Sequence, residues 1–113
     1  MEEAIKENIQ KLQLIEENLH SYLGQKQQVQ SQLMEIESAT AALDSAKSSY
    51  KIIGNIMVEQ SEADLRKELG ERLERVKVRL AALERQEERL KEQAESLQQE
   101  IMKSMKGDSH GEL

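Results

Sequence analysis

The residues that could perform catalysis are few in this chain, and they are scattered. The sequence has no cysteine and only two histidines, His20 and His110. We interpret both as surface residues, because His20 lies on the flank of a predicted helix and His110 in a glycine-containing tail. The carboxylates are distributed around helices, without a cleft that would raise a pKa for acid–base work. The sequence therefore predicts no enzyme, no catalytic residue, no metal site and no cofactor.

Composition argues against several other classes of protein. The chain is 34% charged and 2% aromatic, and it lacks Phe, Trp and Pro. Such a composition is typical of a long helix or a coiled coil, because large rings usually supply much of a globular core. The formal charge of −6 argues against a nucleic-acid partner, and no apolar run approaches the roughly 18 residues of a membrane helix. We expect one cytoplasmic domain, residues 1–113, without a signal peptide or a membrane partner.

Residues 50–59 are the stretch that departs from a helical pattern. Their β-branched side chains flank Gly54-Asn55, a pair typical of a two-residue hairpin turn. The predicted cross-strand partners are Ile53 and Ile56, Ile52 and Met57, and Lys51 and Val58. Both faces of this hairpin are largely apolar, and a lone two-stranded hairpin is marginal in water. We therefore expect other chains to cover it; the alternative is an apolar loop between two helices.

Helical periodicity covers the rest of the chain. The first helix is predicted over about residues 2–47, and the second over about residues 62–106, beginning at a Ser61 cap. The tail, residues 107–113, is predicted to be flexible. Charged pairs on the second helix, such as Glu71 and Arg75, are interpreted as a solvated face. The fold class is mainly α: a long antiparallel coiled-coil helical hairpin with one short β-hairpin between the helices.

Two apolar rows with seven-residue spacing predict the coiled-coil seam of each helix. On the first helix one row holds Ile5, Leu12, Leu19 and Leu33, interrupted by Lys26 and Thr40, and the other holds Ile9, Ile15, Tyr22, Val29, Ile36 and Leu43. The steps Ile9–Leu12–Ile15 predict a local phase shift. On the second helix the rows are Leu69, Val76, Leu83, Leu90 and Leu97, and Leu65, Leu73, Leu80, Ala94 and Ile101.

Antiparallel pairing would bring the two chain ends together, where a two-helix tip cannot bury its whole circumference. The apolar residues there are Ile5, Ile9, Leu12, Leu97, Ile101, Met102 and Met105. Unbranched, polarisable Met suits a surface that accepts dissimilar partners. The tip is therefore a candidate binding surface, and the alternative is that these residues pair only with one another.

The chain resembles the β-type subunit of prefoldin, an ATP-independent holdase chaperone. The resemblance rests on Tyr50-Lys51-x-x-Gly54-x-x-Met57-Val58, on the segment 73–92 and on the Gln-rich run at 25–30. It implies a hexamer of two α-type and four β-type subunits whose hairpins join into intersubunit β-barrels. It also implies capture of unfolded polypeptides and their delivery to a group II chaperonin.

The resemblance also assigns two sets of residues. Contacts with unfolded polypeptides would fall on Ile5, Ile9, Leu12, Ile101, Met102 and Met105. Assembly contacts would fall on Tyr50, Ile52, Ile53, Ile56, Met57 and Val58. The alternative function is a coiled-coil scaffold or adaptor that binds one specific folded partner, which explains the seams but not a hairpin with two apolar faces.

Overall fold

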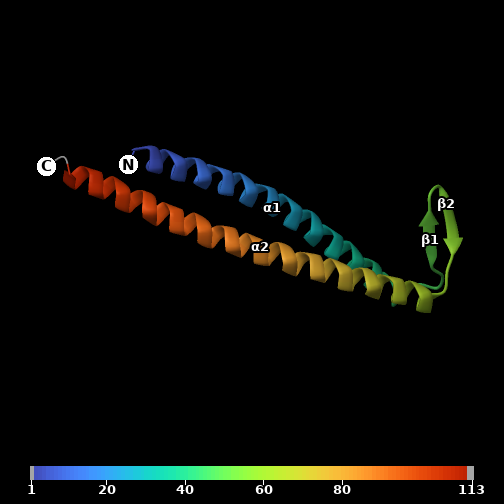
Figure 1. Cartoon of the computed structure of the whole chain (residues 1–113). Helices are drawn as coiled ribbons and strands as arrows, with labels where there is room; N and C mark the ends of the chain where they lie inside the picture. The colour runs from blue at the N-terminus through green and yellow to red at the C-terminus, as the bar shows by residue number, and fades with distance from the viewer. Residues whose placement is uncertain (1, 112–113) are drawn as a thin grey trace. The chain divides into compact units, whose positions relative to one another are not determined.

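The computed structural model describes residues 2–111, with side chains described for residues 2–106. In chain order it contains helix α1 (Glu2–Leu43), strand β1 (Tyr50–Ile53), strand β2 (Ile56–Glu59) and helix α2 (Glu62–Gly111) (Figure 1). The chain divides into two compact units. The terminal unit comprises the described parts of Met1–Lys26 and Leu83–Leu113, and the hairpin unit comprises Gln27–Ala82. That residues 1–113 behave as one domain stays a prediction.

The β-hairpin has the register expected from its turn. Strands β1 and β2 are antiparallel and pair Ile53 with Ile56, Ile52 with Met57, and Lys51 with Val58. Gly54 has φ +59°, whereas Asn55 shares the negative φ of every other non-glycine residue that the structure describes. A left-handed glycine followed by a residue of negative φ is the pattern of a type II′ turn, whose twist matches the flanking strands. The predicted hairpin and register are confirmed.

Polar contacts close the base of the hairpin. The Ser61 hydroxyl accepts a hydrogen bond from the Asp64 amide at 3.2 Å, so it caps α2 as predicted. The Arg66 guanidinium lies 2.6 Å from the Asp44 carboxylate and 2.8 Å from that of Glu62. Arg66 thus joins the residue that follows α1 to the first turn of α2.

The seam of the hairpin unit is the best buried part of the molecule. Val29 is only 1% exposed, and Ile36 and Leu43 are also buried. Thr40, a polar residue in this seam, donates a hydrogen bond from its hydroxyl to the Ile36 carbonyl at 2.8 Å. That bond satisfies the hydroxyl within its own helix, which makes a half-buried Thr compatible with an apolar seam.

The terminal unit corrects the predicted phase shift in α1. Asn8 is half-buried in the seam, whereas Ile9 is exposed (38%). The seam therefore steps from Ile5 through Asn8 to Leu12 in regular increments of three and four residues. The partner helix contacts residues that recur every three and four positions along α1. Burial therefore depends on a residue's place in this spacing, and Ile9 lies on the flank of the seam. Leu83 and Ala94 are buried in the same unit.

The C-terminal ends of both helices differ from the predicted ones. Helix α1 was predicted to run to about residue 47 but ends at Leu43, because the Asp44 amide donates to the Ala41 carbonyl in a tighter turn and Arg66 holds the Asp44 carboxylate. Helix α2 was predicted to end near residue 106 but continues to Gly111. The predicted flexible tail is therefore helical over residues 107–111, and residues 112–113 lie outside the described residues.

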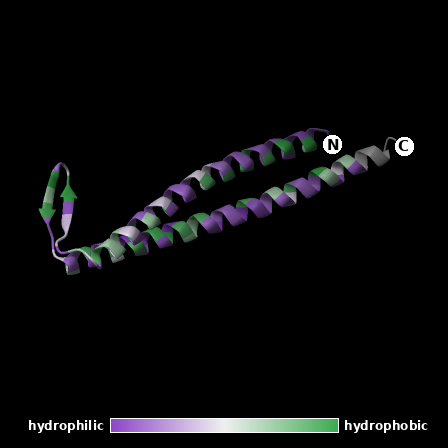
Figure 2. Ribbon diagram, turned by 180° about the vertical axis from the view of Figure 1, so that it is seen from behind, coloured by the Kyte–Doolittle hydropathy of each residue, from purple (hydrophilic) through white to green (hydrophobic). Residues whose placement is uncertain are grey.

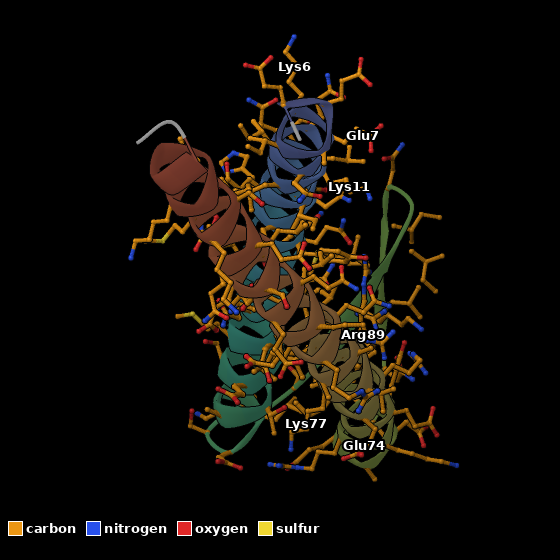
Figure 3. The ribbon with its side chains drawn as sticks, turned by 60° about the vertical axis from the view of Figure 1, so that its left-hand side comes forward. Lys6, Glu7, Lys11, Glu74, Lys77 and Arg89 are labelled. Carbon is orange, nitrogen blue, oxygen red and sulfur yellow. The ribbon has the colours of Figure 1, made fainter. Side chains whose placement is uncertain are left out.

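Hydrophobic and hydrophilic residues are distributed differently over the hairpin and the helices. Figure 2 shows hydrophobic residues on both strands of the hairpin and hydrophilic residues over much of both helices. Figure 3 shows charged side chains projecting outward from the helices, among them Lys6 on α1 and Lys77 on α2. Within residues 2–111, neither helix has a segment long and apolar enough to cross a membrane.

Candidate functional site

The structure presents two apolar surfaces that correspond to the two predicted sets of residues. We call them the hairpin surface (Tyr50, Ile52, Ile53, Ile56, Met57 and Val58) and the helix-end surface (Ile5, Ile9, Leu12, Ile101, Met102 and Met105). The first belongs to the hairpin unit and the second to the terminal unit.

All six side chains of the hairpin surface are exposed, and Ile52 is the most exposed at 71%. Side chains on a strand alternate between faces, so the exposed residues lie on both faces of the hairpin. Within the described residues the sheet has two strands, so the outer edge of each strand carries unpaired backbone groups. A surface with apolar faces and free edges is suited to pairing with strands of other chains.

Hydrogen bonds next to the two strands and one ion pair to α2 hold the hairpin, while its apolar side chains stay exposed. The backbone N–H of Gln60 donates a hydrogen bond to the backbone carbonyl of Ser49 at 3.0 Å. The Ser49 hydroxyl donates in turn to the backbone carbonyl of Gln60 at 2.6 Å. The Lys51 ammonium on β1 lies 2.7 Å from the Glu68 carboxylate on α2. This hydrogen-bonded ammonium lowers the pKa of Glu68 below its ordinary value.

The helix-end surface contains residues of two kinds. Ile5, Leu12 and Ile101 lie in the seam and are half-buried. Ile9, Met102 and Met105 are exposed, with Met102 at 58%. The seam residues stabilise the terminal unit, and the exposed residues provide apolar area that the described chain does not cover. Leu14 and Leu23 of α1 are also exposed in this unit, although neither was predicted to belong to a binding surface.

An ion pair lies within the seam of the terminal unit. The Lys26 ammonium is 3.2 Å from a Glu87 carboxylate oxygen, and their side chains are only 22% and 12% exposed. Lys91 approaches the same oxygen at 3.2 Å. Hydrogen bonding from Lys26, supported by Lys91, lowers the pKa of Glu87. Lys26 was predicted to lie in the seam, whereas Glu87 was not, although a step of four residues beyond Leu83 reaches Glu87.

The residues considered for catalysis are not gathered into a site. His20 is exposed on α1, and the side chain of His110 lies outside the described residues. Among the side chains that the structure describes, no cluster of three or more His, Asp or Glu residues could hold a metal ion. The chemistry that these surfaces offer is binding through apolar contact.

Comparison with known proteins identifies the family. A family model described as "Prefoldin subunit" matches residues 6–108. The chain belongs to the prefoldin subunit family. It is 34% identical over 96 residues to prefoldin subunit beta of Archaeoglobus fulgidus, covering 82% of this chain and 83% of the relative. It is 36% identical over 90 residues to prefoldin subunit beta of Pyrobaculum neutrophilum, covering 77% and 71%.

A solved prefoldin structure has the same fold. The crystal structure of the prefoldin beta subunit from Thermococcus strain KS-1 matches with a TM-score of 0.85 at 31% sequence identity, covering 89% of this chain and 91% of that one. The predicted resemblance to β-type prefoldin is confirmed, as is the fold of two long helices with one short β-hairpin between them. Prefoldin subunits are chaperone subunits, so this chain is a member of a chaperone subunit family.

Proposed function

We propose that this chain is the β-type subunit of an ATP-independent holdase chaperone. It binds unfolded polypeptides through the helix-end surface and delivers them to a group II chaperonin. The action requires neither a catalytic residue nor a cofactor, because the chain retains a polypeptide without altering a covalent bond. The observation that carries the proposal is the exposure of Met102 and Met105 beside the half-buried Ile101 in a member of the prefoldin family.

Flexible apolar side chains suit this task. Unfolded polypeptides differ in sequence, so the surface that binds them must accommodate many shapes. Met has three rotatable bonds and a polarizable sulfur, which lets it adapt to dissimilar apolar groups. Placing two Met residues and Ile9 on exposed positions of a charged protein provides adaptable contact area without loss of solubility.

The hairpin surface has a separate role in this proposal. It joins the hairpins of neighbouring subunits into β-barrels within a cytoplasmic hexamer of two α-type and four β-type subunits. The support is physical: six exposed apolar side chains and two free strand edges stand on one short hairpin. Exposed edges of this kind favour pairing with other strands, and such pairing would cover the apolar faces as well.

The test is suppression of aggregation without nucleotide. The full chain, assembled with an α-type partner, is mixed with several unrelated proteins diluted from denaturant, and light scattering is followed. We expect scattering to fall for all of them as the complex is added. Protection of none, together with tight binding of a single folded protein, would favour the adaptor instead. Transfer is then measured as recovery of native protein when a group II chaperonin and ATP are added.

A further inference from the structure

A groove in the hairpin unit has a charge opposite to that of the whole chain. It encloses about 370 Å³ and is lined by Gln32, Glu35, Ile36, Arg72, Arg75, Val76 and Arg79. We call it the arginine groove. Three guanidinium groups of α2 line it with a single carboxylate, that of Glu35 on α1. The chain as a whole carries a formal charge of −6, so this local excess of positive charge is a distinct feature.

Two of the three guanidinium groups are unpaired. Arg72 lies 3.5 Å from the Glu68 carboxylate, whereas Arg75 and Arg79 form no ion pair within the part of the chain that the structure describes. Glu71 and Arg75, which were interpreted as part of a solvated face, form no ion pair with each other among the described residues. The arginine groove therefore presents two guanidinium groups, those of Arg75 and Arg79, that are not engaged in ion pairs of the described chain.

The spacing of the arginines matches a short extended peptide. Residues 72, 75 and 79 recur at three and four positions, so they share one face of α2 and span about 10 Å along it. An extended chain advances about 3.3 Å per residue and alternates its side chains, so carboxylates on one face recur about every 6.6 Å. Two or three acidic side chains would then reach the three guanidinium groups, and each planar guanidinium can bind a carboxylate through two parallel hydrogen bonds.

The remaining walls favour an acidic peptide over a nucleic acid. Ile36 and Val76 provide apolar surface, against which the methylene groups of Glu side chains can pack. Glu35 and the negative charge of the whole chain oppose a long phosphate backbone, which gains affinity from many cations along its length. We propose that the arginine groove binds an acidic peptide segment in an extended conformation. This proposal shares no residue with the hairpin surface or the helix-end surface and does not depend on the proposed function.

The test uses a fluorescently labelled oligoglutamate peptide and the full chain, with binding followed by anisotropy. The variant is Arg75→Gln with Arg79→Gln. Its matched control is Arg85→Gln with Arg89→Gln, because these two arginines share the same helix, spacing and exposure but do not line the groove. Circular dichroism checks that each variant keeps its helices. We expect the Kd to rise about tenfold in the groove variant and to change less than about twofold in the control.

Three results would overturn the proposal. The first is a wild-type chain that fails to bind oligoglutamate at near-physiological salt, or that binds an oligoglutamine peptide equally well. The second is equal weakening by both pairs of substitutions, which would indicate non-specific attraction. The third is displacement of the peptide by single-stranded DNA of equal charge at a lower concentration, which would assign the groove to nucleic acid.

Discussion

Lys26 and Glu87 lie 61 residues apart in the chain, yet their side chains meet at 3.2 Å within an otherwise largely apolar seam. Each occupies a position that the spacing of three and four residues reserves for a seam side chain. A charged side chain at such a position is costly unless an opposite charge pairs with it. Lys26 and Glu87 pair only when the two helices are aligned in one register, so the pair favours that alignment. We interpret the pair as a device that specifies how α1 and α2 align in the terminal unit.

Reversing the charges tests this interpretation. Lys26→Glu alone brings two carboxylates together and should destabilise the terminal unit by about 1–3 kcal/mol. Adding Glu87→Lys should recover part of that loss, although Lys91 will then repel the new lysine. Thermal unfolding followed by circular dichroism measures both steps. If the double variant loses as much stability as the two single variants lose together, the two residues are not coupled.

Stability should fall at acidic pH through the same pair. The pKa of Glu87 is lower in the folded chain than its ordinary value, so the unfolded chain binds this proton more readily. The stabilisation is therefore present above the unfolded pKa of about 4.3 and is lost as the pH falls through the folded pKa. We expect Glu87→Gln to flatten the acidic decline of the melting temperature. Glu88→Gln, an exposed neighbour outside the seam, serves as the control and should leave the decline unchanged.

Holding of unfolded polypeptides should depend on the helix-end surface. Met102→Ser with Met105→Ser removes two exposed apolar side chains, each contributing about 1.5–3 kcal/mol when fully buried by a ligand. We expect the amount of complex needed to suppress aggregation to rise at least about tenfold, while sizing shows an intact assembly. Met34→Ser with Val78→Ser changes two exposed apolar residues of the hairpin unit and should have little effect. Equal holding by both double variants would refute the assignment.

Assembly should depend on the hairpin surface. Ile53→Asp introduces a charge into a face that assembly would bury, at a cost of several kcal/mol. We expect the variant to stay helical by circular dichroism but to fail to form the complex with an α-type partner on sizing. Met34→Asp introduces the same charge at an exposed helical position and should assemble normally. A complex of normal mass with Ile53→Asp would contradict the proposed role of the hairpin.

The same substitution at two glycines should have opposite effects. Gly54 has φ +59°, where an alanine would cost about 1–2 kcal/mol, so Gly54→Ala should weaken the hairpin and the assembly that it supports. Gly24 lies inside α1, and an added Cβ would meet no atom within 4 Å beyond its chain neighbours and the adjoining backbone of its own helix, so Gly24→Ala should stabilise the helix by about 1 kcal/mol. Dilution of the complex on sizing measures the first effect, and thermal unfolding measures the second.

The hairpin could be predicted because its causes are local. Gly54 permits the left-handed turn, and the β-branched residues on either side favour strands. A two-residue turn leaves no freedom in register, so pairing Ile53 with Ile56 determines every later pair. The helices were equally predictable in kind, because their apolar residues recur with helical spacing. Their ends were not, since Asp44 leaves the helix partly through its contact with Arg66, 22 residues away.

The sequence by itself determined the features that depend on residues close to one another along the chain. These features are the helices, the turn, the register of the hairpin and the apolar character of both candidate surfaces. The tertiary structure alone decided that Asn8 rather than Ile9 enters the seam, that Lys26 meets Glu87, and that Arg75 forms no ion pair with Glu71 in the described part of the chain. These outcomes depend on contacts between α1 and α2 or on which rotamers long side chains adopt. Residue spacing along one helix limits such contacts without specifying them, because they arise only when the second helix is in place.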